Sequence, residues 1–141
     1  MKLFLDTNIL LDFILTERSR NETLQVIFDF LKSSRIETFV TTQSILDMVY
    51  IAEKEGQCKS KTDFFINWML NHFNVRSLDV FDLKLALEDP HPDFEDNAQI
   101  ARAEDQRCDV FLTSDKKILS RGIDSMLVMT PEQFVERMRS A

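Results

Sequence analysis

The chain contains few of the residues that interrupt secondary structure. It has two glycines and three prolines in 141 residues, whereas average usage of about 12% for the two together would give roughly 17. An all-β sandwich needs many turns rich in these residues, so their scarcity excludes that architecture and favours a helix-rich fold with short loops. Hydrophobic residues make up 44% and charged residues 29%, which excludes a disordered or fibrous chain.

Cysteines and long apolar runs are also missing. The two cysteines, Cys58 and Cys108, lie far apart and form no CxxC pair, which excludes a disulfide framework and a zinc site and indicates reduced thiols. No apolar run approaches the roughly 18 residues that a membrane span requires. Asp6 and Asp12 interrupt the apolar amino-terminal segment, which argues against a signal peptide. We therefore expect a cytoplasmic protein without a membrane partner.

Basic residues are outnumbered by acidic ones. Lys and Arg total 17 against 24 Asp and Glu, a net charge of −7. This balance excludes a broad basic surface for nucleic acid. Nucleic acid stays open as a substrate, because acids gathered at one metal site would account for several of the surplus charges.

Short apolar runs alternate with segments of helical periodicity. Strands are expected at residues 2–5, 37–40, 75–78, 109–113 and 126–129. Helices are expected at 8–15, 21–33, 42 or 44 to 56, 60–73, 79–88, 93–106 and 116–120, and from 131 onward. The alternation predicts an α/β fold, a three-layer α/β/α sandwich around a mainly parallel sheet, as one domain over residues 1–141. In such sheets, ligands bind beyond the carboxyl ends of the strands.

Four aspartates are candidates for that edge. Asp6 follows the first strand, and Asp115 follows the strand at 109–113. Asp96 lies in the first turn of a helix, and Asp47 lies on the helix after the second strand. Several carboxylates at one edge repel one another unless they are protonated or bind a cation. Oxygen ligands with open positions suit Mg²⁺ or Mn²⁺, which can activate a water and stabilise charge on a displaced oxygen.

Each aspartate also has a structural interpretation. Asp6 and Asp115 each precede a helix and are candidates to cap it. Asp93 is a better cap by position than Asp96. Asp47 is the most informative, because aspartate is a poor residue for a helix interior and this one is expected near the buried face. Its alternatives are a functional carboxylate or a satisfied structural hydrogen bond.

Three segments resemble the motifs of PIN-domain nucleases. Residues 4–12 (FLDTNILLD) resemble the opening motif, 93–99 (DFEDNAQ) the central acidic motif, and 112–117 (LTSDKK) the third. Their order and spacing fit the family, and the resemblance covers essentially the whole chain. It implies that Asp6, Asp96 and Asp115 bind metal. Asp47 stands where many members carry a glutamate, and the missing methylene shortens its reach.

The resemblance implies a ribonuclease that hydrolyses phosphodiester bonds in RNA with Mg²⁺ or Mn²⁺. Asp93 becomes an auxiliary acid beside its capping role. Thr7, Asn8 and Ser114 become residues that bind a water on the metal or a phosphate oxygen. The cations nearest in sequence for holding RNA are Lys116, Lys117 and Arg121.

Compact PIN members resemble the VapC toxins of bacterial toxin–antitoxin pairs. That likeness implies a homodimer and a small antitoxin protein as partner. The sequence offers one apolar stripe for such contacts, made of Phe64, Phe65, Trp68, Met69 and Phe73. We interpret this stripe first as core and only second as a dimer or partner face.

Three other functions remain as alternatives. A phosphatase of the haloacid-dehalogenase type needs an acid two residues after its nucleophile, and this chain has Asn8 there. A phosphate-accepting receiver domain has paired acids after the first strand, whereas Asp6 has no neighbouring acid in this sequence. A non-catalytic PIN-like binding or regulatory module would carry a degenerate site. The full set of acids argues against degeneration, although the aspartate at position 47 leaves it open.

Overall fold

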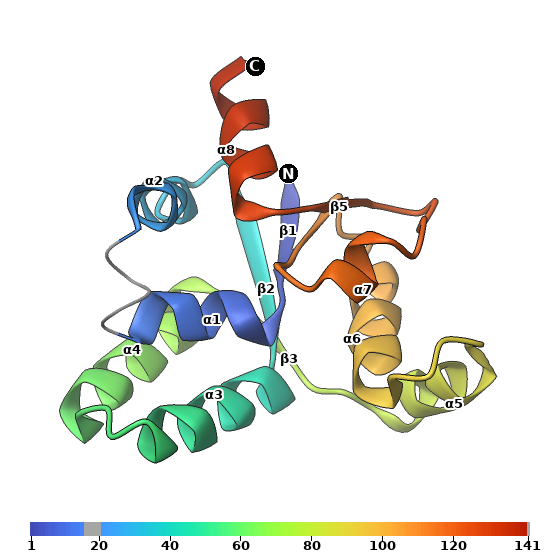
Figure 1. Ribbon diagram of the computed structural model, residues 1–141, viewed down its shortest axis with the longest axis horizontal. Coiled ribbons are helices and arrows are strands. Elements are labelled where there is room, and N and C mark those ends of the chain that lie inside the picture. The colour runs from blue at the N-terminus through green and yellow to red at the C-terminus, as the bar shows by residue number, and fades with distance from the viewer. Residues whose placement is uncertain (16–20, 141) are drawn as a thin grey trace.

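The computed structural model describes residues 1–15 and 21–140, in which strands and helices alternate (Figure 1). The strands are β1 (Lys2–Leu5), β2 (Glu37–Thr41), β3 (Asn74–Arg76), β4 (Val110–Leu112) and β5 (Leu127–Met129). The helices are α1 (Thr7–Ile14), α2 (Glu22–Leu31), α3 (Thr42–Lys54), α4 (Lys59–His72), α5 (Val80–Glu88), α6 (Phe94–Asp105), α7 (Lys116–Leu119) and α8 (Pro131–Ser140). The expected boundaries are confirmed to within a few residues.

The strands form one sheet in the order β3-β2-β1-β4-β5, and every pair is parallel. Successive strand side chains point to opposite faces. On β1, Leu3 and Leu5 pack in the larger core with α1, α2, α3, α4 and α8. Phe4 faces the other way and stacks on Phe111 in a second core against α6 and α7. The predicted three-layer α/β/α sandwich is therefore confirmed, with a sheet that is parallel throughout its described strands.

The start of α8 shows how local sequence sets an element boundary. The Thr130 hydroxyl accepts a hydrogen bond from the Gln133 N–H at 3.2 Å. Gln133 Oε1 in turn accepts one from the Thr130 N–H at 3.0 Å. These reciprocal bonds satisfy N–H groups at the beginning of the helix, which has no earlier turn to supply acceptors.

The apolar stripe on α4 lies mostly in the core. Phe65, Met69 and Phe73 are buried, and Trp68 packs against them while remaining partly exposed. Phe64 points away, with 73% of its surface exposed. The core interpretation is confirmed for the other four residues and wrong for Phe64.

The structure also describes the cysteine thiols and the character of the helices. Both cysteines carry free thiols, Cys58 exposed and Cys108 buried. Within residues 1–15 and 21–140, no helix combines the length and apolar character needed to cross a membrane.

Candidate metal centre

Asp6 stands at the carboxyl end of the central strand β1. Its Oδ1 accepts a hydrogen bond from the Thr7 N–H at 2.8 Å, which caps α1, and its Oδ2 accepts one from the Thr113 hydroxyl at 2.7 Å. The residue is only 6% exposed, and this burial raises the pKa of its carboxyl group. The two hydrogen bonds oppose that shift, while the charges of Asp115 and Asp93 add to it.

Asp93 and Asp96 stand at the start of α6. Asp93 caps the helix by accepting a hydrogen bond from the Asp96 N–H at 3.0 Å, as its position predicted. In Asp96, Oδ2 is buried and has no hydrogen-bond partner among the described residues. Burial raises the pKa of Asp96 to about 7, and the charges of Asp93, Asp6 and Asp115 contribute in that order. An acid this perturbed is a candidate functional group.

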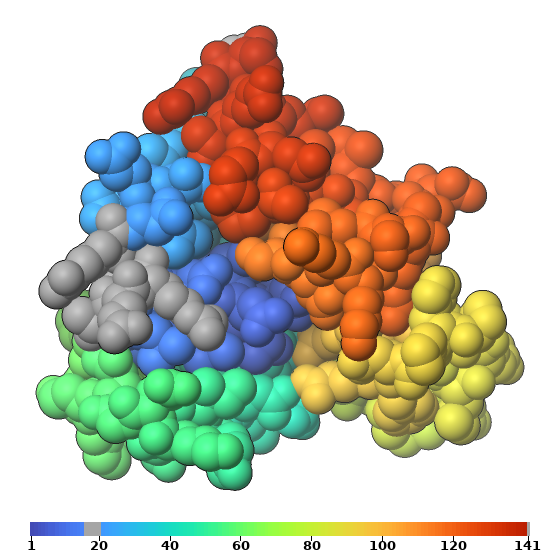
Figure 2. Space-filling view, in the orientation of Figure 1, coloured from blue at the N-terminus to red at the C-terminus, as the bar shows by residue number. Residues whose placement is uncertain are grey.

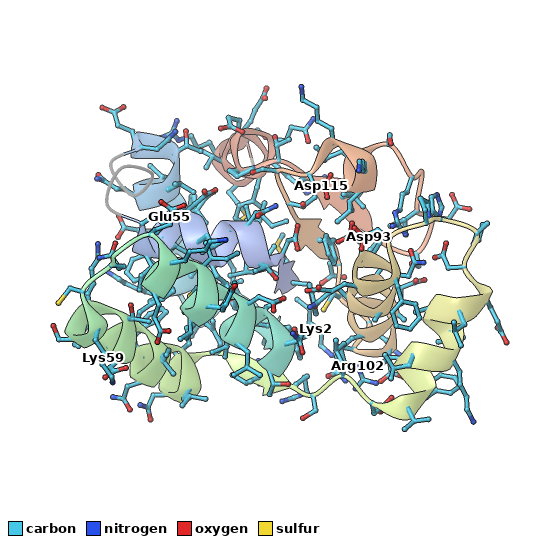
Figure 3. The ribbon with its side chains drawn as sticks, turned by 60° about the horizontal axis from the view of Figure 1, so that its bottom comes forward. Lys2, Glu55, Lys59, Asp93, Arg102 and Asp115 are labelled. Carbon is cyan, nitrogen blue, oxygen red and sulfur yellow. The ribbon has the colours of Figure 1, made fainter. Side chains whose placement is uncertain are left out.

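Asp115 approaches from the carboxyl end of β4. Its Oδ1 accepts a hydrogen bond from the Lys117 N–H at 2.9 Å and caps α7. Its own N–H donates to the Thr113 hydroxyl oxygen at 3.0 Å. Figure 3 shows Asp115 and Asp93 at the neighbouring beginnings of α7 and α6. Asp6, Asp93, Asp96 and Asp115 therefore form one group, which we call the acid rim.

Asp47 and Glu95 extend the acid rim toward α3. Asp47 is half-buried, and its Oδ1 accepts a hydrogen bond from Gln43 Nε2 at 2.9 Å. A hydrogen bond to Asp47 is the main reason why the pKa of Glu95 rises to about 7, ahead of burial and neighbouring charge. Sequence reasoning missed Glu95. Its signal was its place beside Asp96, at the start of a helix in an acidic segment.

The predicted polar auxiliaries occupy different environments. Thr7 is half-buried, and its hydroxyl lies 2.8 Å from the Ser44 hydroxyl. Asn8 and Ser114 are exposed. Figure 2 shows the blue amino-terminal segment between α3 and the orange segment near residues 110–120, which places α1 at the centre of this surface.

A buried polar cluster behind the acid rim was also missed. Thr41, Ser44 and Gln99 are each at most 2% exposed and are hydrogen-bonded to one another. They come from β2, α3 and α6, so the cluster joins a strand to the two helices that carry Asp47 and Asp96. Nothing in the spacing of these three residues predicts that they meet.

Of the three predicted cations near the acid rim, two are exposed as expected and one is not. Lys116 and Lys117 are exposed. The Arg121 side chain is only 4% exposed, and its Nη1 donates to Asn97 Oδ1 at 2.6 Å. It also lies 3.7 Å from Asp89. The expectation that Arg121 offers an exposed charge to RNA is therefore wrong, because its guanidinium group binds the protein itself.

The chemistry of the acid rim fits a divalent cation. In the described ranges, no three His, Cys, Asp or Glu side chains are arranged closely enough to hold a metal ion together. Oxygens of Asp6 and Asp115 serve instead as helix caps. Even so, the partnerless buried oxygen of Asp96 and the mutual repulsion of the acids are conditions that a cation relieves. All the donors are oxygens, as Mg²⁺ and Mn²⁺ prefer.

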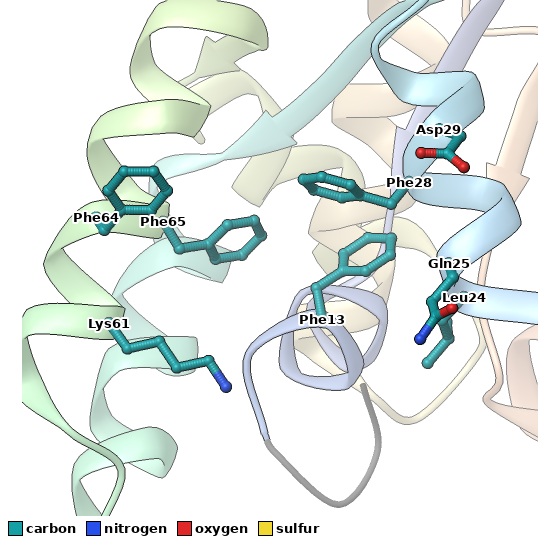
Figure 4. A pocket seen from close by; sticks show the side chains of 8 residues that line it. All are labelled: Phe13, Leu24, Gln25, Phe28, Asp29, Lys61, Phe64 and Phe65. Carbon is teal, nitrogen blue, oxygen red and sulfur yellow. The ribbon is translucent and has the colours of Figure 1, made fainter. Parts of the chain in front are cut away.

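A second surface feature lies near the carboxyl-terminal end of α1. A hollow of about 430 Å³ is lined by aromatic side chains of α1, α2 and α4, including Phe13, Phe28, Phe64 and Phe65. Lys61 and Asp29 stand at its edges (Figure 4). The hollow is mainly apolar and shares no lining residue with the acid rim, so its chemistry suits apolar contacts and not metal binding.

The fold and the acid rim define a class of protein: a parallel α/β/α domain with a carboxylate cluster at the carboxyl edge of its sheet. A family model described as "PIN domain" matches residues 2–117. The chain therefore belongs to the PIN-domain family, and the resemblance seen in its motifs is confirmed. No curated protein is similar enough in sequence to count as a match.

Solved structures share the fold at low sequence identity. A chain of VapBC2 from Rickettsia felis, bound to a promoter DNA fragment, is 14% identical with a TM-score of 0.68, over 92% of this chain and 98% of that one. A chain of a toxin–antitoxin complex from Klebsiella pneumoniae is 19% identical with a TM-score of 0.66, over 93% of this chain and 98% of that one. VapC20 from Mycobacterium tuberculosis, described as a sarcin–ricin-loop-cleaving toxin, is 9% identical with a TM-score of 0.67, over 89% of this chain and 98% of that one. The fold is thus that of VapC-type PIN domains.

Proposed function

We propose that the protein is a ribonuclease that depends on Mg²⁺ or Mn²⁺ and hydrolyses phosphodiester bonds inside RNA chains. The observation that carries this proposal is the acid rim, in which the buried Oδ2 of Asp96 has no partner in the described residues and the carboxyl pKa is about 7. Membership of the PIN-domain family supports it. So does the likeness in fold to a toxin described as cleaving the sarcin–ricin loop.

The acid rim and Asp47 would have different roles in binding the cation. Asp6, Asp96 and Asp115 would hold the cation, and Asp47 would assist from α3. Asp93 keeps its capping role and adds negative charge, which strengthens cation binding. A bound Mg²⁺ or Mn²⁺ supplies an activated water and stabilises charge on the leaving oxygen.

Exposed polar residues near the acid rim would hold the RNA. Lys116 and Lys117 follow Asp115 directly and are exposed, so their ammonium groups can reach backbone phosphates. Asn8 and Ser114 are exposed beside Asp6 and Asp115 and can bind phosphate oxygens or water on the metal. Two lysines beside the site can hold RNA locally even though the chain carries a net charge of −7.

We further propose that the protein is the toxin of a toxin–antitoxin pair and forms a homodimer. One structural neighbour is described as a toxin–antitoxin complex. Large apolar side chains are exposed on α3 and α5, namely Leu46, Tyr50, Phe81 and Leu87. Exposed apolar residues gathered on helices mark surfaces for protein contacts. Sedimentation analysis tests the dimer, and co-expression with the product of a neighbouring small reading frame tests the antitoxin.

The direct test is incubation of mixed RNA substrates with the purified protein and Mn²⁺ or Mg²⁺. An Asp6→Asn/Asp96→Asn double variant removes two rim charges and is expected to lose cleavage. Asp63→Asn is the matched control, because Asp63 is an exposed aspartate on α4 that pairs with Lys59. A phosphomonoester substrate in parallel tests the phosphatase alternative.

The outcomes separate the candidate functions. Cleavage by the wild type and the control, lost in the double variant, supports the ribonuclease and its site. Cleavage that persists in the double variant contradicts the site. Absence of both cleavage and metal binding would favour a non-catalytic module.

A further inference from the structure

The buried cluster of Thr41, Ser44 and Gln99 has a defined supply of hydrogen-bond donors. Gln99 Nε2 donates to Thr41 Oγ1 at 2.9 Å and to Ser44 Oγ at 3.1 Å. An amide nitrogen donates and does not accept. Both hydroxyl oxygens therefore receive a hydrogen from Gln99, and this limits where their own hydrogens can point.

Thr41 has no acceptor capacity left for Ser44. Its Oγ1 accepts from Gln99 and also from the Ser44 N–H at 3.0 Å. A hydroxyl oxygen has two lone pairs, so both are used. The Thr41 hydrogen itself is directed to Gln99 Oε1 at 3.1 Å or to Ser44 Oγ at 3.2 Å.

Within residues 1–15 and 21–140, Ser44 is left with one acceptor for its hydroxyl hydrogen, which is Thr7 Oγ1. The two oxygens are 2.8 Å apart, the shortest contact that Ser44 Oγ makes in the cluster. Thr7 thus accepts from Ser44 and keeps its own hydrogen. Among the described residues, Thr7 Oγ1 has no second partner. Its hydroxyl is therefore a donor without a protein acceptor, directly beside Asp6.

We propose that Gln99 is a positioning residue, which acts through Ser44 to hold the Thr7 hydroxyl as a hydrogen-bond donor for a phosphate oxygen of the RNA. This inference rests on the proposed ribonuclease function. Phosphate oxygens accept hydrogen bonds and do not donate them, so a hydroxyl with a free hydrogen suits them. A purely apolar residue at position 99 would fill the same space without burying an amide, which carries a desolvation cost.

Two measurements test the proposal, and the first does not depend on activity. NMR of the buried Ser44 hydroxyl proton reports its acceptor. If Ser44 donates to Thr7, a Thr7→Val variant removes the acceptor and shifts this resonance. If Thr7 instead donates to Ser44, the Ser44 proton points elsewhere and its resonance stays in place, which would overturn the proposal.

The second measurement is a double-variant cycle on single-turnover cleavage. Gln99→Met and Thr7→Val are each expected to slow cleavage about tenfold, the order of one hydrogen bond to a charged group. Because both act on the same bond, the double variant is also expected to be about tenfold slower. Ser44→Ala offers a second route to the same loss if Gln99→Met does not fold. Thr62→Val is the control, since Thr62 is a buried threonine on α4, away from the acid rim.

The results have distinct meanings. Losses that multiply to about a hundredfold show that Gln99 does not act through Thr7, as a merely structural role would predict. Unchanged cleavage in Gln99→Met also overturns the proposal. If the wild type cleaves no RNA, the proposed function and the phosphate role of Thr7 both fail. The NMR result then still decides whether Gln99 orients Ser44 toward Thr7.

Discussion

The hydroxyl of Thr113 donates a hydrogen bond to Oδ2 of Asp6 across 2.7 Å, joining the carboxyl ends of β4 and β1. Thr113 is fully buried and Asp6 is 6% exposed. Burial raises the pKa of Asp6, and this bond is the strongest influence that opposes the rise. Thr113 therefore helps to keep Asp6 ionised, which is the form that binds a cation.

Replacing Thr113 by valine is expected to make cleavage more sensitive to acid. Without the hydroxyl, the pKa of Asp6 rises further, and the carboxylate is protonated at a higher pH. The acidic limb of the pH–rate profile should therefore move to higher pH than in the wild type. Rates measured from pH 5 to 8 on one RNA substrate test this.

Thr38→Val is the matched control for Thr113→Val. Thr38 is also a buried threonine of the sheet, but its hydroxyl has no hydrogen-bond partner among the described residues. Valine has the same shape and no polar atom, so the free energy of unfolding should rise by about 1 kcal/mol. The pH profile should stay as in the wild type. Identical profiles in all three proteins would refute the role given to Thr113.

The metal-free protein is expected to lose stability as the pH rises toward neutrality. Asp96 and Glu95 have pKa values of about 7 in the folded protein, above the ordinary values of 3.8 and 4.5. Between about pH 4 and pH 7 the folded state therefore binds more protons at these two groups than the unfolded state does. Their contribution to the free energy of unfolding is present at low pH and is lost as the pH rises through about 7.

Asp96→Asn tests the contribution of Asp96 to this effect. The variant lacks one of the two carboxyls with a pKa of about 7, and it also removes a charge that raises the pKa of Glu95, so its unfolding free energy should fall less between pH 5 and pH 8. Urea denaturation at several pH values in the presence of EDTA measures both slopes. Parallel curves for the wild type and Asp96→Asn would show that Asp96 titrates normally.

Asp47 is expected to matter less than Asp96 for cleavage. Its carboxylate is engaged by Gln43 and Glu95, and its side chain is one methylene shorter than the glutamate found in many PIN members. Asp47→Asn should reduce the single-turnover rate by about tenfold, the low end for loss of a group that supports a metal site, and Asp96→Asn by considerably more. Equal losses in the two variants would place Asp47 among the principal ligands.

A buried ion pair between α5 and α6 is expected to dominate the stability of that helix pair. Asp82 is fully buried, and its carboxylate lies 3.0 Å from Arg102 Nε and accepts a hydrogen bond from Nη2 at 3.1 Å. Arg102→Leu leaves Asp82 buried and unpaired and should cost about 3–5 kcal/mol.

Asp79 provides the contrast to Asp82. It lies 3.3 Å from Arg102 Nη2, but its side chain is 55% exposed. Exposed ion pairs contribute at most about 1 kcal/mol, so Asp79→Asn should change the unfolding free energy little. Similar losses for Arg102→Leu and Asp79→Asn in urea denaturation would contradict the importance of burial.

The fold was predictable because its signals are local. Apolar runs such as 2–5 and 110–112 mark strands buried on both faces, and caps such as Asn21 and Thr130 mark helix starts. The position of Asp93 at the start of its helix predicted its capping bond correctly. Such patterns depend on neighbours within four residues, which the sequence displays directly.

The contacts that complete the site could not be predicted, because they depend on how separate elements pack. Gln99 and Thr41 bond across 58 residues of sequence, and Arg121 reaches Asn97 across 24. A polar residue inside a helix or after one looks like surface until its packing partner is known. Glu95 was missed for the same reason, since its partner Asp47 belongs to another helix.

The most direct test of this account is a titration of the metal-free protein with Mn²⁺, followed by electron paramagnetic resonance, in the wild type and in Asp96→Asn. Asp63→Asn again serves as the control. The account predicts saturable Mn²⁺ binding by the wild type and the control, and binding weakened by about tenfold or more in Asp96→Asn, because a neutral amide replaces a carboxylate ligand. Absence of saturable binding in the wild type, or equal affinity in Asp96→Asn, would contradict the claim that the acid rim is a metal site.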